Sequence, residues 1–212
     1  MDEKISVIVA EDERAYRRAL VENLMSHADI EVLGEASNGE ELVGLCGECA
    51  PNVAVVDIRM PVMDGIEAAR ILRARQPSVK ILVLTTFDDD EYLRDMFAIG
   101  IDGYLLKPGG SPQIAEAVRG VYNGFGAVDG GVSRKLGNLL AAPPKSEQSG
   151  LTEAEKRVAS LILDGKYNKD IADTLDISYG RVRNIVSKIY TRMGAVDRED
   201  LVDKLEKEGL PL

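Results

Sequence analysis

Hydrophobic positions in the first half of the chain form short continuous runs separated by longer amphipathic stretches. The runs span residues 5–10, 32–36, 53–56, 81–84 and 103–106. Continuous apolar runs of this length are typical of buried parallel strands, and the stretches between them have the spacing of helices. The alternation reaches about residue 122 and predicts a doubly wound α/β fold, with a five-stranded parallel sheet covered by helices on both faces.

A change of composition follows this half. Residues 124–150 contain Gly-Phe-Gly, Gly-Gly and Pro-Pro among polar residues, which is typical of an interdomain linker with room for a short helix over 133–141. We therefore expect a first domain over 1–123, a linker over 124–150 and a second domain over 151–212. The second domain has an all-helical pattern, with a capping box from Thr152 to Glu155. A short corner over 175–178 predicts a helix-turn-helix.

Composition narrows the function classes. No apolar run reaches the roughly 18 residues of a membrane span, and the first residues lack a basic, then apolar, secretory signal, so we expect a cytoplasmic location and no membrane partner. The net charge of −10 argues against a chain coated with nucleic acid. Cys46 and Cys49 could read as a redox pair or half a zinc site, but their apolar helical spacing favours packing.

Three carboxylates and two further polar residues lie at the ends of the predicted strands. Glu11 and Asp12 follow the first strand and Asp57 follows the third, so all three should meet at the carboxyl edge of the sheet. This much negative charge favours a hard cation, and the oxygen ligands suit Mg²⁺. Such a site can position a phosphoryl group for in-line transfer to Asp57, with Lys107 and the Thr85 hydroxyl binding its oxygens.

Together these residues resemble the receiver domain of two-component response regulators, over residues 4 to about 122. The matching motifs are Ala10-Glu11-Asp12, Val56-Asp57-Ile58-Arg59-Met60-Pro61 with Asp64-Gly65, Val83-Leu84-Thr85 and Tyr104-Leu105-Leu106-Lys107-Pro108. The resemblance implies a flavodoxin-like fold and a sensor histidine kinase whose phosphohistidine donates to Asp57. It also implies Mg²⁺ held by Glu11, Asp12, Asp57 and the backbone carbonyl of Arg59. A switch in which Thr85 turns toward the phosphoryl group and Tyr104 rotates inward is implied as well.

Two other readings of the acidic pocket remain. A phosphohydrolase with an Asp nucleophile would want a second acid two residues after Asp57, where Arg59 stands instead. A DNA-binding protein independent of phosphorylation would have a degraded pocket, whereas this one is complete. We therefore expect no turnover enzyme, although slow self-dephosphorylation of Asp57 is compatible with the site.

The predicted helix from Tyr179 to Met193 has an apolar stripe on one side and polar, basic residues on the other. The stretch 177–196 contains four basic residues and no acid. We expect this helix to enter the DNA major groove, with Arg181 and Asn184 near base edges. The residues expected to contact phosphates are Arg183, Lys188 and Arg192, and Ser187 flanks the same DNA-binding face.

Residues 151–208 resemble the C-terminal domain of the NarL/FixJ, or LuxR-type, family. The matching motifs are Leu151-Thr152, Glu155, Asn168-Lys169-Asp170-Ile171-Ala172, Leu175-Asp176-Ile177-Ser178, Val182-Arg183-Asn184 and Met193-Gly194-Ala195. The resemblance implies a transcriptional regulator that forms a homodimer when phosphorylated and binds double-stranded DNA, with RNA polymerase as a further candidate partner. It places the dimer contact in the last helix, where the candidates are Leu201, Val202 and Leu205.

Four residues depart from the family patterns. Glu11 stands where the receiver family usually has Asp. In the LuxR-type domain, Arg181, Ile185 and Ala154 stand where the family usually has Thr, His and Arg. The longer arm of Glu11 keeps its charge, so the pocket stays complete. The two changes in the recognition helix make the operator sequence unpredictable from relatives.

Overall fold

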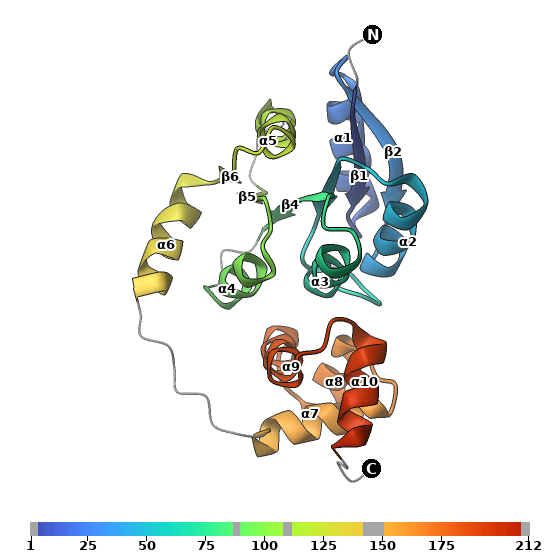
Figure 1. Ribbon diagram of the computed structural model, residues 1–212, viewed down its shortest axis with the longest axis vertical. Coiled ribbons are helices and arrows are strands. Elements are labelled where there is room, and N and C mark those ends of the chain that lie inside the picture. Colours follow the sequence, from blue (N-terminus) through green and yellow to red (C-terminus); the bar gives the residue numbers. More distant parts are fainter. Residues whose placement is uncertain (1–3, 87–89, 108–111, 142–150, 209–212) are drawn as a thin grey trace. The chain divides into compact units, whose positions relative to one another are not determined.

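The computed structural model describes residues 4–86, 90–107, 112–141 and 151–208 and divides the chain into two compact units, Met1–Ala142 and Pro143–Leu212. The first unit is built on a single sheet (Figure 1). Its strands are β1 (Ile5–Ala10), β2 (Ile30–Ala36), β3 (Val53–Val56), β4 (Lys80–Thr85), β5 (Gly103–Leu106) and β6 (Ala127–Val128). All neighbours pair in parallel in the order β2-β1-β3-β4-β5-β6.

Helices cover both faces of this sheet, as the sequence predicts for a doubly wound fold. In the first unit they are α1 (Arg14–Met25), α2 (Gly39–Cys49), α3 (Gly65–Arg75), α4 (Asp90–Ile99), α5 (Pro112–Tyr122) and α6 (Gly130–Ala141). One apolar cluster joins the sheet to α2, α3, α4 and α6, and a second joins its other face to α1 and α5. The central strand β3 is buried along its whole length, which explains its uninterrupted Val-Ala-Val-Val sequence.

The sheet has six strands instead of the expected five. The additional strand, β6, lies within the expected linker, where Ala127 and Val128 pair with Gly103 and Tyr104 of β5. The following helix α6 inserts Val132 into the apolar cluster on one face of the sheet. Residues up to 141 therefore belong to the first unit, where the sequence predicts a linker, because Ala127, Val128 and Val132 attach this Gly-rich segment to the sheet and its apolar cluster. The short helix expected over 133–141 is present as α6. The rest of that segment lies outside the described residues.

The second unit is a bundle of α7 (Glu153–Leu163), α8 (Asn168–Leu175), α9 (Tyr179–Met193) and α10 (Arg198–Lys207) around one apolar cluster. The predicted capping box starts α7, since the Thr152 hydroxyl accepts from the Glu155 amide while the Glu155 carboxylate accepts from the Thr152 amide. A short turn joins α8 to α9, with Asp176 in the left-handed conformation at φ 52° and Ser178 capping α9. Within the described residues, no helix is long and apolar enough to cross a membrane.

Candidate phosphoacceptor pocket and DNA-binding helix

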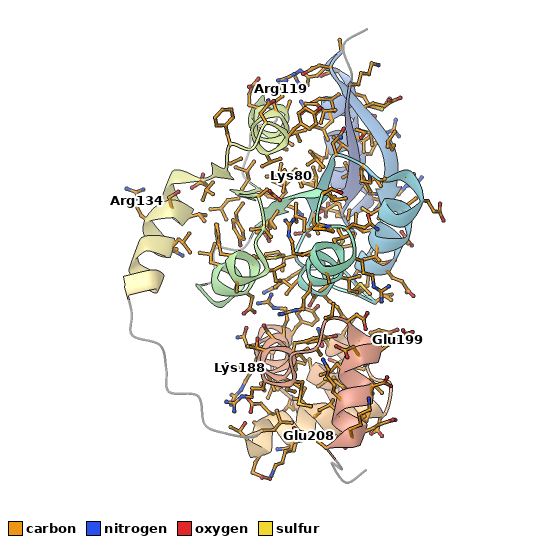
Figure 2. All side chains as sticks on the ribbon, in the orientation of Figure 1. Lys80, Arg119, Arg134, Lys188, Glu199 and Glu208 are labelled. Atoms are coloured by element: carbon orange, nitrogen blue, oxygen red, sulfur yellow. The ribbon has the colours of Figure 1, made fainter. Side chains whose placement is uncertain are left out.

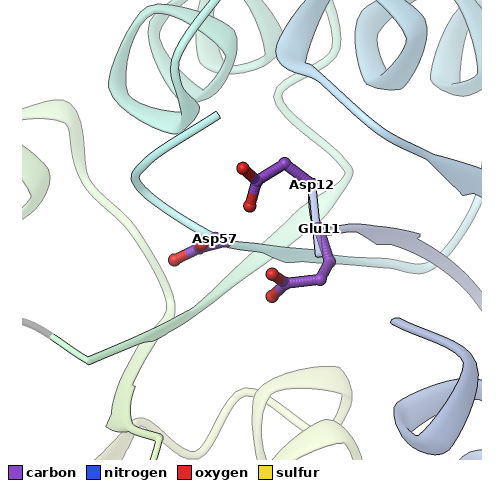
Figure 3. A group of neighbouring side chains, drawn as sticks. All are labelled: Glu11, Asp12 and Asp57. Atoms are coloured by element: carbon purple, nitrogen blue, oxygen red, sulfur yellow. The ribbon is translucent and has the colours of Figure 1, made fainter. Parts of the chain in front are cut away.

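Three carboxylates converge at the carboxyl edge of the sheet, where β1 and β3 end (Figure 3). Glu11 and Asp12 directly follow β1, and Asp57 directly follows β3, so the pairing of these two strands sets their separation. One oxygen from each carboxylate lies within 4.8 Å of the others. Glu11 and Asp57 are buried, whereas Asp12 is exposed. The structure thus brings together the three acids that the sequence selects.

Lys107 completes this pocket from the end of β5. Its ammonium lies 3.0 Å from Asp57 Oδ2 and also forms an ion pair with Glu11 Oε2. The Lys107 side chain is 9% exposed, so both ion pairs are shielded from water. The backbone holds the base of this arm, because the Lys107 amide donates to the Thr85 carbonyl at 2.6 Å. An ammonium in this position can bind an oxygen of a group attached to Asp57.

The loop after Asp57 turns back closely against the end of β3, where the Gly65 amide donates to the Ile58 carbonyl. The Ile58 amide donates to Asp57 Oδ1 at 2.7 Å, which orients the carboxylate. A Cβ at Gly65 would lie 2.0 Å from the Asp57 carbonyl oxygen, so only glycine fits there. Asp64 caps α3 by accepting from the amides of Ile66 and Glu67. The Asp64-Gly65 motif is therefore what allows α3 to start against the strand that carries Asp57.

Burial and charge act against each other in this pocket. Burial raises the pKa of both Glu11 and Asp57 above the usual carboxyl range, and the Lys107 ammonium only partly opposes it. Burial also lowers the pKa of Lys107, but the carboxylates of Asp57 and Glu11 outweigh it, so the net shift is upward. The pocket therefore favours the charged form of Lys107, whereas burial makes the charged forms of Glu11 and Asp57 less stable.

The donor set of the pocket fits a hard divalent cation. Three carboxylate oxygens in partial coordination leave positions for water or a phosphoryl oxygen, which is the pattern that Mg²⁺ adopts at phosphate-handling sites. The exposed Asp12 keeps this side of the pocket open to solvent. Arg59, whose backbone carbonyl is the predicted fourth ligand, lies two residues after Asp57 and has an exposed side chain.

The two predicted switch residues lie on adjacent strands. Thr85, the last residue of β4, is fully buried. Tyr104 on β5 is also fully buried, and its ring stacks on Phe97 of α4 with centroids 6.4 Å apart. In this structure the Tyr104 ring is therefore already inside the apolar cluster. Its rotation, like the turning of Thr85, stays a prediction.

The helix predicted to enter the DNA groove is α9. Its apolar stripe, with Val182, Val186 and Ile189, is buried in the cluster of the second unit. Arg181 and Lys188 are exposed, and Figure 2 shows Lys188 on α9. Asn184 is half-buried. Exposed basic residues opposite a buried stripe are the arrangement that DNA phosphate and base contacts require.

Three other predicted DNA contacts are placed differently. Arg192 Nε lies 3.5 Å from Glu155 Oε1, so it pairs with the carboxylate that caps α7. Arg183 and Ser187 are buried in this structure, although neither belongs to the apolar cluster of the second unit. Contacts of these three residues with DNA stay predictions.

The prediction of the dimer contact needs correction. Leu201 and Leu205 are fully buried in the apolar cluster of their own unit, because their spacing of four residues turns both toward α7 and α9. They are therefore core residues, and assigning them to a dimer surface was wrong. Val202 is only partly buried on α10 and stays a candidate.

Two residues of α1 also support the pocket, although they belong to none of the sequence motifs. Arg17 Nη1 donates to the Glu11 carbonyl at 2.5 Å, while its Nε donates to Glu35 on β2 at 3.3 Å. The Tyr16 ring lies beneath the Lys107 ammonium, with 4.7 Å between Nζ and the ring centroid. The only sequence signal was their place in the first turn of the helix after Glu11 and Asp12.

Comparison with known proteins agrees with this geometry. The family described as "Response regulator receiver domain" matches residues 7–119, and "Bacterial regulatory proteins, luxR family" matches residues 149–205. The chain is 35% identical to the transcriptional regulatory protein DesR of Bacillus subtilis (strain 168), covering 97% of this chain and 98% of DesR. It is 33% identical to the DNA-binding transcriptional activator DevR/DosR of Mycobacterium tuberculosis (strain ATCC 25618 / H37Rv), covering 90% and 88%.

A solved structure spans both units. The crystal structure of ChrA, a response regulator of a heme-sensing two-component system, matches with a TM-score of 0.54 and 27% identity over 98% of this chain and 99% of ChrA. Both family matches and the relatives thus cover the sheet unit and the helical unit in the same order. The chain belongs to the LuxR family of DNA-binding two-component response regulators.

Proposed function

We propose that this protein accepts a phosphoryl group on Asp57 from a sensor histidine kinase and that the phosphorylated form dimerises and binds double-stranded DNA to regulate transcription. The observation that carries the proposal is the convergence of Asp57, two further carboxylates and Lys107 at one edge of the sheet. A receiver domain joined to a LuxR-type domain supports the coupling of the two activities.

The chemistry follows from the positions of the side chains. An Asp57 carboxylate oxygen attacks the phosphorus of the phosphohistidine, the bond to the imidazole nitrogen breaks, and an acyl phosphate forms on Asp57. Lys107 and the Thr85 hydroxyl would bind phosphoryl oxygens. Glu11, Asp12, Asp57 and the Arg59 carbonyl would hold Mg²⁺, which neutralises charge during the transfer. The Ile58 amide holds Asp57 in place.

The second unit supplies the output. Arg181 and Lys188 on the exposed side of α9 would contact DNA, and paired units would occupy two half-sites about one helical turn apart. The relatives support this reading, because DevR/DosR is described as a DNA-binding transcriptional activator. Cooperation between two copies makes DNA affinity depend on dimerisation and hence on Asp57.

The test is phosphoryl uptake from acetyl phosphate, measured by intact-protein mass spectrometry with Mg²⁺ or with EDTA. We expect the wild type to gain one phosphoryl group only in Mg²⁺, and Asp57→Asn to gain none. The matched control Asp29→Asn changes an exposed acid on the α1–β2 loop and should behave as wild type. Uptake by Asp57→Asn at the wild-type rate would assign the acceptor to another residue.

A further inference from the structure

Tyr16 joins the phosphoacceptor pocket to the apolar core beneath it. It is the third residue of α1 and packs against the cluster between the sheet and helices α1 and α5. Its ring faces the Lys107 ammonium with 4.7 Å between Nζ and the ring centroid. Because Tyr16 also packs against this cluster, the position of its ring does not depend on the ammonium alone.

Lys107 is thus held by two attractions of different kinds. One is the ion pairing with Asp57 and Glu11, and the other is the attraction of a cation to the electron-rich face of an aromatic ring. The Lys107 side chain is 9% exposed, so water weakens neither attraction much. Ion pairing must change when a divalent cation and a phosphoryl group share the carboxylate oxygens, whereas the ring is unaffected.

We propose that Tyr16 is a positioning residue for Lys107, whose ring keeps the ammonium over Asp57 when a divalent cation and a phosphoryl group occupy the carboxylates. The inference rests on the proposed function and assigns a further residue to it. An aliphatic side chain at position 16 would fill the space but would leave Lys107 with only the carboxylates. The ring should therefore matter more for phosphoryl binding than for the apo-protein.

The first experiment measures the affinity of the full chain for beryllofluoride, a phosphoryl mimic, in Mg²⁺ by ¹⁹F NMR. We expect Tyr16→Leu to weaken binding about 3- to 30-fold, the range that a shielded cation–ring contact supports. Tyr16→Phe and Tyr16→Trp should stay within about twofold of wild type, since both keep the ring. In the Lys107→Met background, Tyr16→Leu should have no further effect.

A matched control separates this contact from general packing. Tyr122 of α5 packs against the same apolar cluster, so Tyr122→Leu should leave beryllofluoride affinity unchanged. Equal losses in Tyr122→Leu and Tyr16→Leu would overturn the proposal, as would an undiminished effect of Tyr16→Leu in the Lys107→Met background. Loss in Tyr16→Phe equal to that in Tyr16→Leu would assign the role to the hydroxyl and also overturn it.

A second measurement distinguishes failure of this inference from failure of the proposed function. A double-mutant cycle of Tyr16→Leu and Lys107→Met, by urea unfolding in EDTA, reports their contact without any phosphoryl group. Coupling in the cycle with no beryllofluoride binding by wild type would refute the proposed function and with it the phosphoryl role of Tyr16. Normal beryllofluoride binding by both wild type and Tyr16→Leu would overturn the inference about Tyr16 alone.

Discussion

Removing the positive charge of Lys107 should destabilise the apo-protein strongly, because it leaves buried carboxylates without their cation. The separation of 3.0 Å from Asp57 corresponds to about 5 kcal/mol of attraction at an effective dielectric constant near 20, before desolvation is subtracted. Breaking a buried pair on one side typically costs about 3–5 kcal/mol. We therefore expect Lys107→Met to lower the free energy of unfolding of the sheet unit by about 3–4 kcal/mol at pH 7 in EDTA.

The loss of stability in Lys107→Met should be greater at higher pH. Without Lys107 the folded-state pKa of Glu11 and Asp57 rises further above the unfolded value, so the variant is most stable below that value and loses stability as the pH rises. Protonation of these carboxyls at lower pH removes part of the unpaired charge, so the deficit should be smaller at pH 5 than at pH 7. Saturating Mg²⁺ at pH 7 should also reduce the stability deficit of Lys107→Met.

Hydrogen exchange of the β3 amides is a suitable assay, because it reports opening of the sheet unit independently of the second unit. The control is Arg18→Met, which removes a highly exposed ion pair with Glu22 on the surface of α1 and should leave the stability of the sheet unit close to that of the wild type. A Lys107→Met deficit below about 1 kcal/mol, or one equal at pH 5 and pH 7, would refute this electrostatic account of the pocket.

Three further outcomes follow from other parts of the structure. Lys188→Ala should weaken DNA binding across sequences and reduce its salt dependence by about one phosphate contact, in titrations where Lys156→Ala on α7 behaves as wild type. Asp29 should titrate by NMR with a pKa of about 2, and this pKa should return toward 3.8 in Arg119→Gln. Because the folded-state pKa is lowered, the pair stabilises the fold above pH 3.8, and this stabilisation is lost as the pH falls to about 2. A pKa of Asp29 near 3.8 in the wild type would contradict the pairing. Val62 is exposed at φ 66°, so Val62→Gly should stabilise the sheet unit by about 0.5–1 kcal/mol in hydrogen exchange, and a loss of stability would show that the loop is unstrained.

The sequence was sufficient to predict a strand and its site residue where an apolar run ended directly before a charged or polar residue. Five strands could be found because each carries a short apolar run in the sequence, and Asp57 could be placed because the fully buried β3 ends directly before it. The sixth strand could not be found, because two residues that pair with an edge strand leave no periodic pattern. Its recognition depends on the β5 edge, which exists only after the sheet has formed.

Side-chain partners were harder to foresee than backbone elements. The approach of Tyr16 to Lys107 joins residues that are distant in sequence, and no local pattern encodes it. Arg192 was assigned to DNA from its charge alone, yet it lies next to the carboxylate of Glu155. The family resemblance places Leu201 among the dimer candidates, yet its side chain is buried in its own unit, because an amphipathic helix does not reveal which neighbour its apolar side will contact.

The most direct test of the central claim, that occupation of Asp57 controls assembly, is the solution mass of the full chain by sedimentation. The comparison is with and without Mg²⁺ and beryllofluoride, using Asp57→Ala as the control. We predict a shift from monomer to dimer in the wild type alone. No shift in the wild type, or an equal shift in Asp57→Ala, would contradict the claim and place control of assembly outside Asp57.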